Sequence, residues 1–155
     1  MPDMDFELKH FTLDEAQSLL PVLETLLKRA IEASRAVEEI EERMQALSRR
    51  IFLSGGMLLD VERVRRRKAA HETHMQTVKD SVAEIDAIGV QVKDLNAGLL
   101  DFPCLIEGET VLLCWKMGES RIEFWHTLDA GFRGRQPLDE RFTKKAGKDN
   151  PEFPN

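Results

Sequence analysis

Two apolar heptad patterns, separated by a glycine turn, most constrain what this chain can fold into. The first pattern alternates spacings of three and four residues from Leu23 to Ile51, and the second does so from Val61 to Ile85. Between them, Ser54-Gly55-Gly56 suits a tight turn. Because this spacing places apolar side chains on one stripe of a helix, we expect two long helices that form an antiparallel, coiled-coil-like hairpin.

We call the two stripes the first and second seams, and both include positions near the middle of the hairpin. The first seam comprises Leu23, Leu26, Ala30, Ala33, Val37, Ile40, Met44, Leu47 and Ile51. The second comprises Val61, Val64, Lys68, His71, Met75, Val78, Val82 and Ile85. Folding about Gly55 brings Lys68 and His71 opposite Val37, Ile40 and Glu41, which predicts a polar layer within the hairpin.

The helix ends carry recognisable signals. Thr12 with Glu15 three residues later is a capping-box pattern, so the first helix should begin there. Pro21 lacks a backbone donor, which predicts a kink or break near Leu19 and Leu20. Gly89 is a suitable stop for the second helix.

After Val90 the apolar period changes to two, which indicates strands. We expect a three-stranded antiparallel meander over residues 99–106, 110–117 and 121–128, with turns at Gly108-Glu109 and Gly118-Glu119. This register puts His126 beside Val111 and puts Cys114 on the opposite face. Pro103 favours an edge position for the first strand.

The predicted fold class is therefore α+β, a long two-helix hairpin with a small antiparallel sheet. The 155 residues fit a single domain. We assign residues 11–89 to the helical hairpin, 90–137 to the sheet with a Gly/Arg loop, and 138–155 to a mobile tail.

Charge and composition exclude several classes of protein. The net charge is −6, although the stretch from Arg43 to Lys68 has eight basic residues against two acidic ones. No apolar run is long enough to span a membrane and the chain begins with acidic residues, so we expect a cytoplasmic protein. In that compartment Cys104 and Cys114 should be reduced thiols. The sequence contains no P-loop, G-x-G-x-x-G, H-E-x-x-H or G-x-S-x-G motif.

The leading functional hypothesis is a non-catalytic interaction or scaffold module. Two helices alone leave apolar residues such as Leu27 and Ile31 beside the first seam without a partner, and a homodimeric four-helix bundle would cover them. We therefore expect a homodimer, with a protein partner as a further option. We expect no cofactor.

A divalent metal is the alternative to that expectation. Asp101, Glu119 and His126 are acceptable ligands for zinc, manganese or iron. In the predicted register, however, Glu119 and His126 lie roughly 20 Å apart along a strand, so they cannot share an ion. Asp101 would lie near the Glu119 end.

A second alternative is a small-anion site, or an enzyme pocket, beside the loop Gly131 to Arg135. Arg133 and Arg135 offer fork-shaped donors suited to carboxylate or phosphate, and the glycines allow backbone amides to face a ligand. His126 can change charge near neutral pH, and Trp125 neighbours it. The competing hypothesis is that the arginines pair with carboxylates and brace the loop.

A third alternative places nucleic-acid contact at the basic tip, which we define as Arg63, Arg65, Arg66 and Arg67. Phosphate contacts need only exposed basic side chains. The tip lacks interleaved aromatic residues and a base-reading motif, so an ion-paired, solvated surface is favoured and nucleic-acid binding is disfavoured.

Several segments together resemble one known family. They read F-T-L-D-E-A-Q-S-L-L-P from Phe11 to Pro21, then G-L-L-D-F-P, C-W-x-x-G-E-x-x-I-x-x-W-H and G-F-x-G-R. Over about Phe11 to Leu138 the chain resembles an uncharacterised bacterial family, catalogued as domain of unknown function 2203. The resemblance implies no activity, because no role is assigned to the matched residues Asp101, Trp115, Glu119, Trp125, His126, Gly134 and Arg135.

Overall fold

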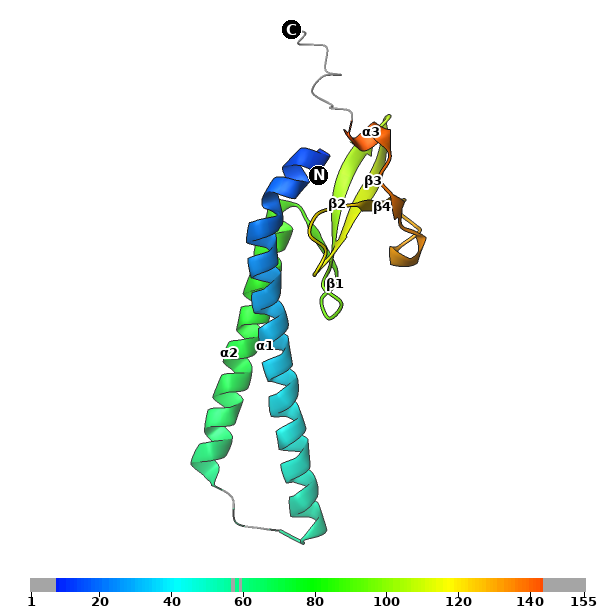
Figure 1. Cartoon of the computed structure of the whole chain (residues 1–155). Coiled ribbons are helices and arrows are strands. Elements are labelled where there is room, and N and C mark those ends of the chain that lie inside the picture. Colours follow the sequence, from blue (N-terminus) through cyan, green and yellow to red (C-terminus); the bar gives the residue numbers. More distant parts are fainter. Residues whose placement is uncertain (1–7, 57, 59, 144–155) are drawn as a thin grey trace, which may run out of the picture. The chain divides into compact units, whose positions relative to one another are not determined.

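A computed structural model of the chain describes residues 8–56, 58 and 60–143. These residues form two compact units. The helical unit comprises residues 26–84, and the sheet unit comprises the described parts of residues 1–25 and 85–155. Helix α1 (Leu13–Leu53) begins in the sheet unit and continues through the helical unit (Figure 1).

Within the helical unit, α1 and α2 (Val61–Ile88) form the predicted antiparallel hairpin. The first seam is buried from Leu26 to Ile40, whereas Met44, Leu47 and Ile51 are only half-buried. The predicted polar layer is present, since His71 Nε2 lies 2.9 Å from Glu41 Oε2. The hairpin prediction is thus confirmed, but its core closes on one half only.

The prediction for the second seam was only partly correct. Val64, His71 and Val78 are half-buried as expected, but Lys68 and Met75 are exposed. Their places on the buried stripe are taken by Arg67 and His74, both half-buried, and by Ser81, which is buried. Because α2 has few apolar residues, its pattern does not decide which of two neighbouring stripes faces α1.

The helix ends follow local sequence closely. Thr12 and Glu15 form the reciprocal capping box, with hydrogen bonds of 3.0 and 3.1 Å between each backbone N–H and the other side chain. Gly89 ends α2 with a φ of 105°. The N–H groups of Gly89 and Val90 donate to Asp86 and Ile85, which satisfies the last carbonyls of the helix.

Of the kink or break predicted near Leu19 and Leu20, the break is wrong, because α1 continues through Pro21. Proline removes only one intrahelical hydrogen bond. Leu20 and Leu23 are buried on either side of it, and this burial outweighs the loss of one bond.

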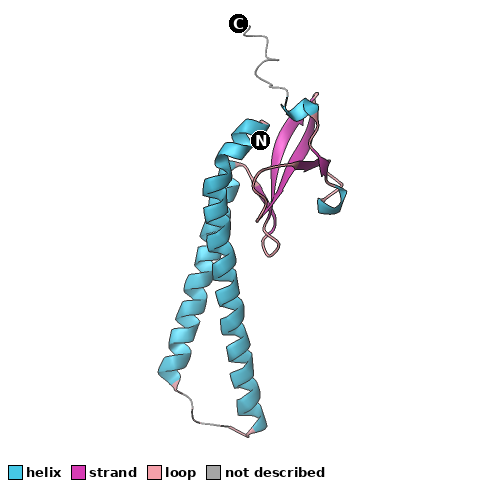
Figure 2. Cartoon of the chain, viewed as in Figure 1, coloured by secondary structure: helices cyan, strands magenta, loops and turns pink. Residues whose placement is uncertain are grey.

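The sheet unit contains five antiparallel strands in the order β1-β2-β3-β4-β5, where three were predicted (Figure 2). The strands are β1 (Gln91–Asp94), β2 (Leu99–Ile106), β3 (Glu109–Lys116), β4 (Phe124–His126) and β5 (Gln136–Pro137). The α+β class is therefore correct, and the two additional strands are the short outer ones. They are too short to produce an alternating pattern that the sequence could reveal.

Strand β2 lies between β1 and β3, so its predicted edge position was wrong. Pro103 is tolerated because β1 pairs only with the first residues of β2, from Leu99 to Asp101. Beyond the end of β1, the Pro103 carbonyl accepts a hydrogen bond of 2.7 Å from the backbone N–H of Phe11. The N–H that proline lacks would point to the same uncovered side, so no ladder hydrogen bond is lost.

Both predicted turns differ from the observed ones. The β2–β3 turn is centred on Glu107 and Gly108, whose φ angles of 51° and 82° are those of a two-residue hairpin loop. The β3–β4 connection begins with a turn in which Glu119 N donates to Lys116 O, and it continues irregularly to Phe124. As a result His126 pairs with Leu112 instead of Val111, a slip of one residue.

One face of the sheet packs against aromatic residues from the chain ends. The Phe11 and Phe102 rings meet edge to face, with centroids 5.8 Å apart. Helix α3 (Glu140–Thr143) buries Phe142 against Trp125, at a centroid distance of 5.6 Å. The residues of α3 belong to the predicted tail. The rest of that tail, from residue 144, lies outside the described residues.

Within the described residues, no helix combines the length and the apolar character needed to cross a lipid bilayer.

Two glycines allow a test of how tightly the sheet is packed. Gly98 and Gly108 both have positive φ, at 72° and 82°. A Cβ on Gly98 would lie 2.8 Å from Cβ of Met117, whereas a Cβ on Gly108 would meet nothing within 4 Å. Either alanine should cost about 1–2 kcal/mol for the left-handed backbone. We expect Gly98→Ala to lower the free energy of unfolding by at least about 1 kcal/mol more, because of this steric overlap.

Equilibrium urea unfolding of the two variants measures this difference. Gly108→Ala is the matched control, since it has the same backbone strain without the clash. Equal losses in the two variants would contradict the close approach of Gly98 to Met117.

Candidate functional site

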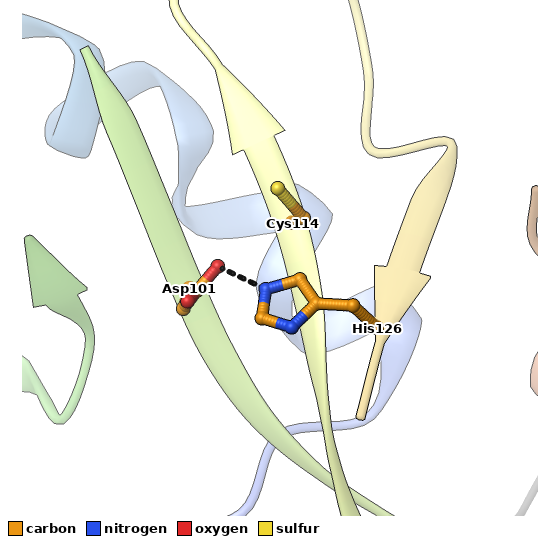
Figure 3. A group of neighbouring side chains, drawn as sticks. All are labelled: Asp101, Cys114 and His126. Carbon is orange, nitrogen blue, oxygen red and sulfur yellow. Dashed lines mark hydrogen bonds and ion pairs between the residues drawn. The ribbon is translucent and has the colours of Figure 1, made fainter. Parts of the chain in front are cut away.

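Three buried residues that can ligate or ionise come together from three neighbouring strands: Asp101 on β2, Cys114 on β3 and His126 on β4 (Figure 3). Asp101 pairs directly with Cys114, which places both side chains on one face of the sheet. His126 pairs with Leu112, two residues from Cys114, and therefore shares that face. Each of the three is at most 1% exposed.

The hydrogen bonds of His126 assign its protons. Its Nδ1 lies 2.7 Å from the carbonyl oxygen of Thr127, and a carbonyl only accepts, so Nδ1 carries a proton and donates it. Its Nε2 lies 3.1 Å from Asp101 Oδ1. Since a carboxylate and an unprotonated nitrogen cannot bond to each other, one proton lies between Nε2 and Oδ1.

Ligand-capable atoms of these three residues lie within 4.8 Å of one another. The other carboxylate oxygen of Asp101, Oδ2, is buried and has no hydrogen-bond partner among the described residues. A buried carboxylate oxygen without a partner is costly, typically by about 1–3 kcal/mol. The cluster is thus only partly satisfied by the residues around it.

Cys114 was expected on the opposite face from His126. The slip of one residue between β3 and β4 moves it to the His126 face, with Phe124 as its cross-strand partner. Cys104 pairs with Val111 and is three positions away from Asp101 along β2, so the two cysteines do not face each other. Both thiols are free.

Arg135 also lies beside Cys114. Its guanidinium group stacks on the rings of Phe124 and Phe132, with centroids 4.0 and 4.4 Å away. It donates to both carboxylate oxygens of Glu119, at 2.8 and 3.4 Å, and lies 3.9 Å from the Cys114 sulfur. Burial lowers the pKa of Arg135, but the bonds to Glu119 and Cys114 raise it overall above its ordinary value.

Glu119 is itself fixed by the turn after β3. Its carboxylate accepts a hydrogen bond of 2.9 Å from the backbone N–H of Lys116, and its carbonyl accepts one of 3.0 Å from the Trp115 indole. Glu119 therefore holds Arg135 and is not a member of the Asp101 cluster. Asp101 instead contacts His126 and pairs with Cys114, a pairing that differs from the expected register.

The remaining predicted site residues lie elsewhere. Trp125 is on the opposite face of β4 from His126, where it packs against Phe142 and Arg141. Arg133 is exposed, and no hydrogen bond or ion pair joins it to another described residue. Of the four anion-site candidates, only His126 and Arg135 each lie next to Cys114.

The basic tip is a solvated surface in the described part of the helical unit. Arg63, Arg65 and Arg66 are exposed and Arg67 is half-buried. Arg65 pairs with Glu62 at 2.9 Å, a bond between two exposed side chains that contributes little stability.

Sequence reasoning missed Cys114 as a site residue. Its membership depends on a turn centred on Glu107-Gly108, and the sequence interpretation centred that turn one residue later. Had the turn been placed there, Asp101 would have been paired with Cys114 from sequence alone.

The two thiols should react slowly below alkaline pH. Burial, with a smaller contribution from Glu15 for Cys104 and from Asp101 for Cys114, raises the pKa of each to about 11. At pH 8 only about one thiol in a thousand is then ionised, and the thiolate is the reactive form. Alkylation of the folded protein in a chelating buffer should therefore accelerate about tenfold per pH unit between pH 8 and 10.

Protein unfolded in urea is the reference, because its thiols should titrate near the ordinary cysteine value of about 8.5. Rapid alkylation of the folded chain at pH 7.5 would contradict the assigned environments.

Comparison with known proteins supplies a family but no activity. Neither a curated protein nor a solved structure is significantly similar to the chain. The family described as "Uncharacterized conserved protein (DUF2203)" matches residues 9–138, which include Asp101, Cys114, His126 and Arg135. The chain belongs to this family.

Proposed function

We propose that the sheet unit binds a divalent transition-metal ion of the zinc type through Asp101, Cys114 and His126. The observation that carries this proposal is the convergence of a carboxylate, a thiol and an imidazole within 4.8 Å at a buried position. Such a set occurs rarely in a core without a reason, because a carboxylate and an imidazole are costly to bury.

The donor set suits zinc. Zinc accepts sulfur, nitrogen and oxygen ligands at about 2.0–2.3 Å, so the ligand atoms need to approach one another by about 1 Å. The His126 Nδ1–H bond to Thr127 O is the outer hydrogen bond that metal-binding histidines commonly make, and it leaves Nε2 as the ligating atom. An ionised Asp101 and Cys114 would together balance the two charges of the ion.

A catalytic cysteine is the main competing function for this cluster. It requires a base that takes the thiol proton, but both nitrogens of His126 already bond to Thr127 and Asp101. Burial also raises the pKa of Cys114 to about 11, the direction opposite to activation. These observations favour a ligand role for Cys114 over a nucleophilic one.

Three protein ligands leave one coordination position for water or a small ligand. This arrangement is typical of metal sites that do chemistry, whereas purely structural zinc sites usually have four protein ligands. Arg135 would act from outside the coordination sphere by donating toward the Cys114 sulfur, which stabilises a thiolate. A reducing compartment such as the predicted cytoplasm would keep the thiol available.

Metal content of the full-length protein tests the proposal. We expect one zinc ion per chain by native mass spectrometry with elemental analysis, and a thiolate-to-cobalt charge-transfer absorption after substitution with cobalt(II). Cys114→Ser and Asp101→Asn conserve size and should lower metal affinity roughly 100-fold or more, because each removes a ligand. Affinity should rise with pH, since ligation releases the protons of Cys114 and His126.

Cys104→Ser is the matched control, because Cys104 is equally buried but lies outside the cluster. It should retain the metal and the cobalt absorption. Absence of metal from the wild type after incubation with excess zinc at pH 8, or equal loss in both cysteine variants, would falsify the proposed site.

The other hypotheses concern different features and remain predictions. The anion-site hypothesis is weakened because Glu119 occupies the donors of Arg135. The scaffold hypothesis concerns the helical unit and is compatible with a metal site in the sheet unit.

A further inference from the structure

The helical unit leaves part of its seam open. Beyond Ile40 no described residue of α1 is fully buried. A groove of about 560 Å³ lies at this level between the helices, lined by Glu41, Met44, Gln45, Lys68, His71 and Glu72. Toward the turn, four large apolar side chains are between 62 and 96% exposed: Phe52, Leu53, Leu58 and Val61.

The sign of the charge along the two helices changes at the level of this groove. The stretch from Arg43 to Lys68, which we call the basic band, has eight basic residues and two acidic ones. On the other side of the groove, residues 28–42 of α1 and 69–84 of α2 have eight acidic residues against four basic ones. Seven of the acidic residues are Glu38, Glu39, Glu41 and Glu42 on α1 and Glu72, Asp80 and Glu84 on α2. We call these seven acidic residues the acidic band.

The contact between Glu41 and His71 shows which residues of the two helices lie at one level. Because the helices are antiparallel, a step of one residue toward the turn raises the residue number by one on α1 and lowers it by one on α2. On this scale the basic band is centred near residue 47 of α1 and the acidic band near residue 37. The groove therefore lies midway between bands of opposite charge, roughly 7 Å from the centre of each.

We propose that two copies of the helical unit associate side by side and antiparallel, with a two-fold axis through the groove near Glu41 and His71. A rotation about that axis puts the basic band of each copy against the acidic band of the other. It also carries the exposed Phe52 and Leu53 to the level of the partner's Ile31 and Val78, which are half-buried in the single chain. One symmetric contact thus covers both the charged bands and the exposed side chains of Phe52 and Leu53.

The distribution of charge favours this antiparallel orientation over a parallel one. A parallel pair with both turns at one end would put the two basic bands together and the two acidic bands together, which is repulsive. The occupant of the groove is therefore a second copy in the antiparallel orientation.

Charge reversal with rescue tests the interface in the full-length protein. Arg63→Glu with Arg66→Glu, and separately Glu38→Lys with Glu42→Lys, should each weaken dimerisation at least tenfold by sedimentation. All four side chains are exposed, so neither change should unfold the chain, and circular dichroism checks this. An equimolar mixture of the two variants should form a heterodimer of wild-type affinity, because both contacts between bands are then again between opposite charges.

Distances distinguish the orientation. Ser54 lies about 12 residues from the proposed axis level, so spin labels on Ser54→Cys should be roughly 35 Å apart in the dimer. Spin labels on Gln45→Cys, about three residues from the axis level, should instead be only roughly 10 Å apart. Cys104 and Cys114 are buried and contribute little labelling.

A chain that stays monomeric at low salt overturns the proposal. So does a short distance between Ser54 labels, which indicates the parallel pair, or a mixture of the charge variants that fails to associate.

Discussion

The candidate site depends on one constraint, the hydrogen-bond register of the sheet. The loop at Glu107 and Gly108 sets the pairing of β2 with β3, and this pairing puts Asp101 opposite Cys114. The connection after β3 sets the pairing with β4 and so brings His126 to the same face. Because side chains alternate between faces, a slip of one residue at either junction would move one member to the other side of the sheet. Backbone geometry, more than any contact among the three side chains, assembles the cluster.

The surroundings of the cluster distinguish it from an ordinary buried ion pair. Asp101 and His126 share one proton, but Asp101 Oδ2 has no partner among the described residues. Next to them, Arg135 is held by two aromatic rings and by Glu119, so its charge is already balanced before it approaches the Cys114 sulfur. Two buried polar side-chain atoms have no partner among the described residues: Asp101 Oδ2 in the cluster, and Trp125 Nε1 on the opposite face of the sheet. The cluster therefore contains a buried carboxylate oxygen that a ligand could satisfy.

The two units differ in how completely they bury their apolar residues. The sheet unit is small but rich in buried residues, because β2 has six consecutive buried positions, from Leu99 to Cys104, and β3 has five, from Val111 to Trp115. The helical unit is long and highly charged, and its first seam is closed only as far as Ile40. An open seam flanked by bands of opposite charge is a surface that a symmetric partner can complete, whereas the sheet has little apolar face left to share.

The sequence by itself determined the two helices, their ends at Thr12 and Gly89, the turn near Gly55 and the α+β class. These features depend on neighbours within four or five residues, such as the capping box and the seam spacing, so the pattern contains the relevant interactions. The tertiary structure decided the strand register, the continuation of α1 through Pro21 and the stripe of α2 that faces α1. It also decided that Cys114 lies beside Asp101 and His126. Each of these depends on contacts between distant segments, or on turn geometry where a difference of one residue exchanges the two faces of a strand. The cluster of Asp101, Cys114 and His126 could therefore be found only once those segments were placed together.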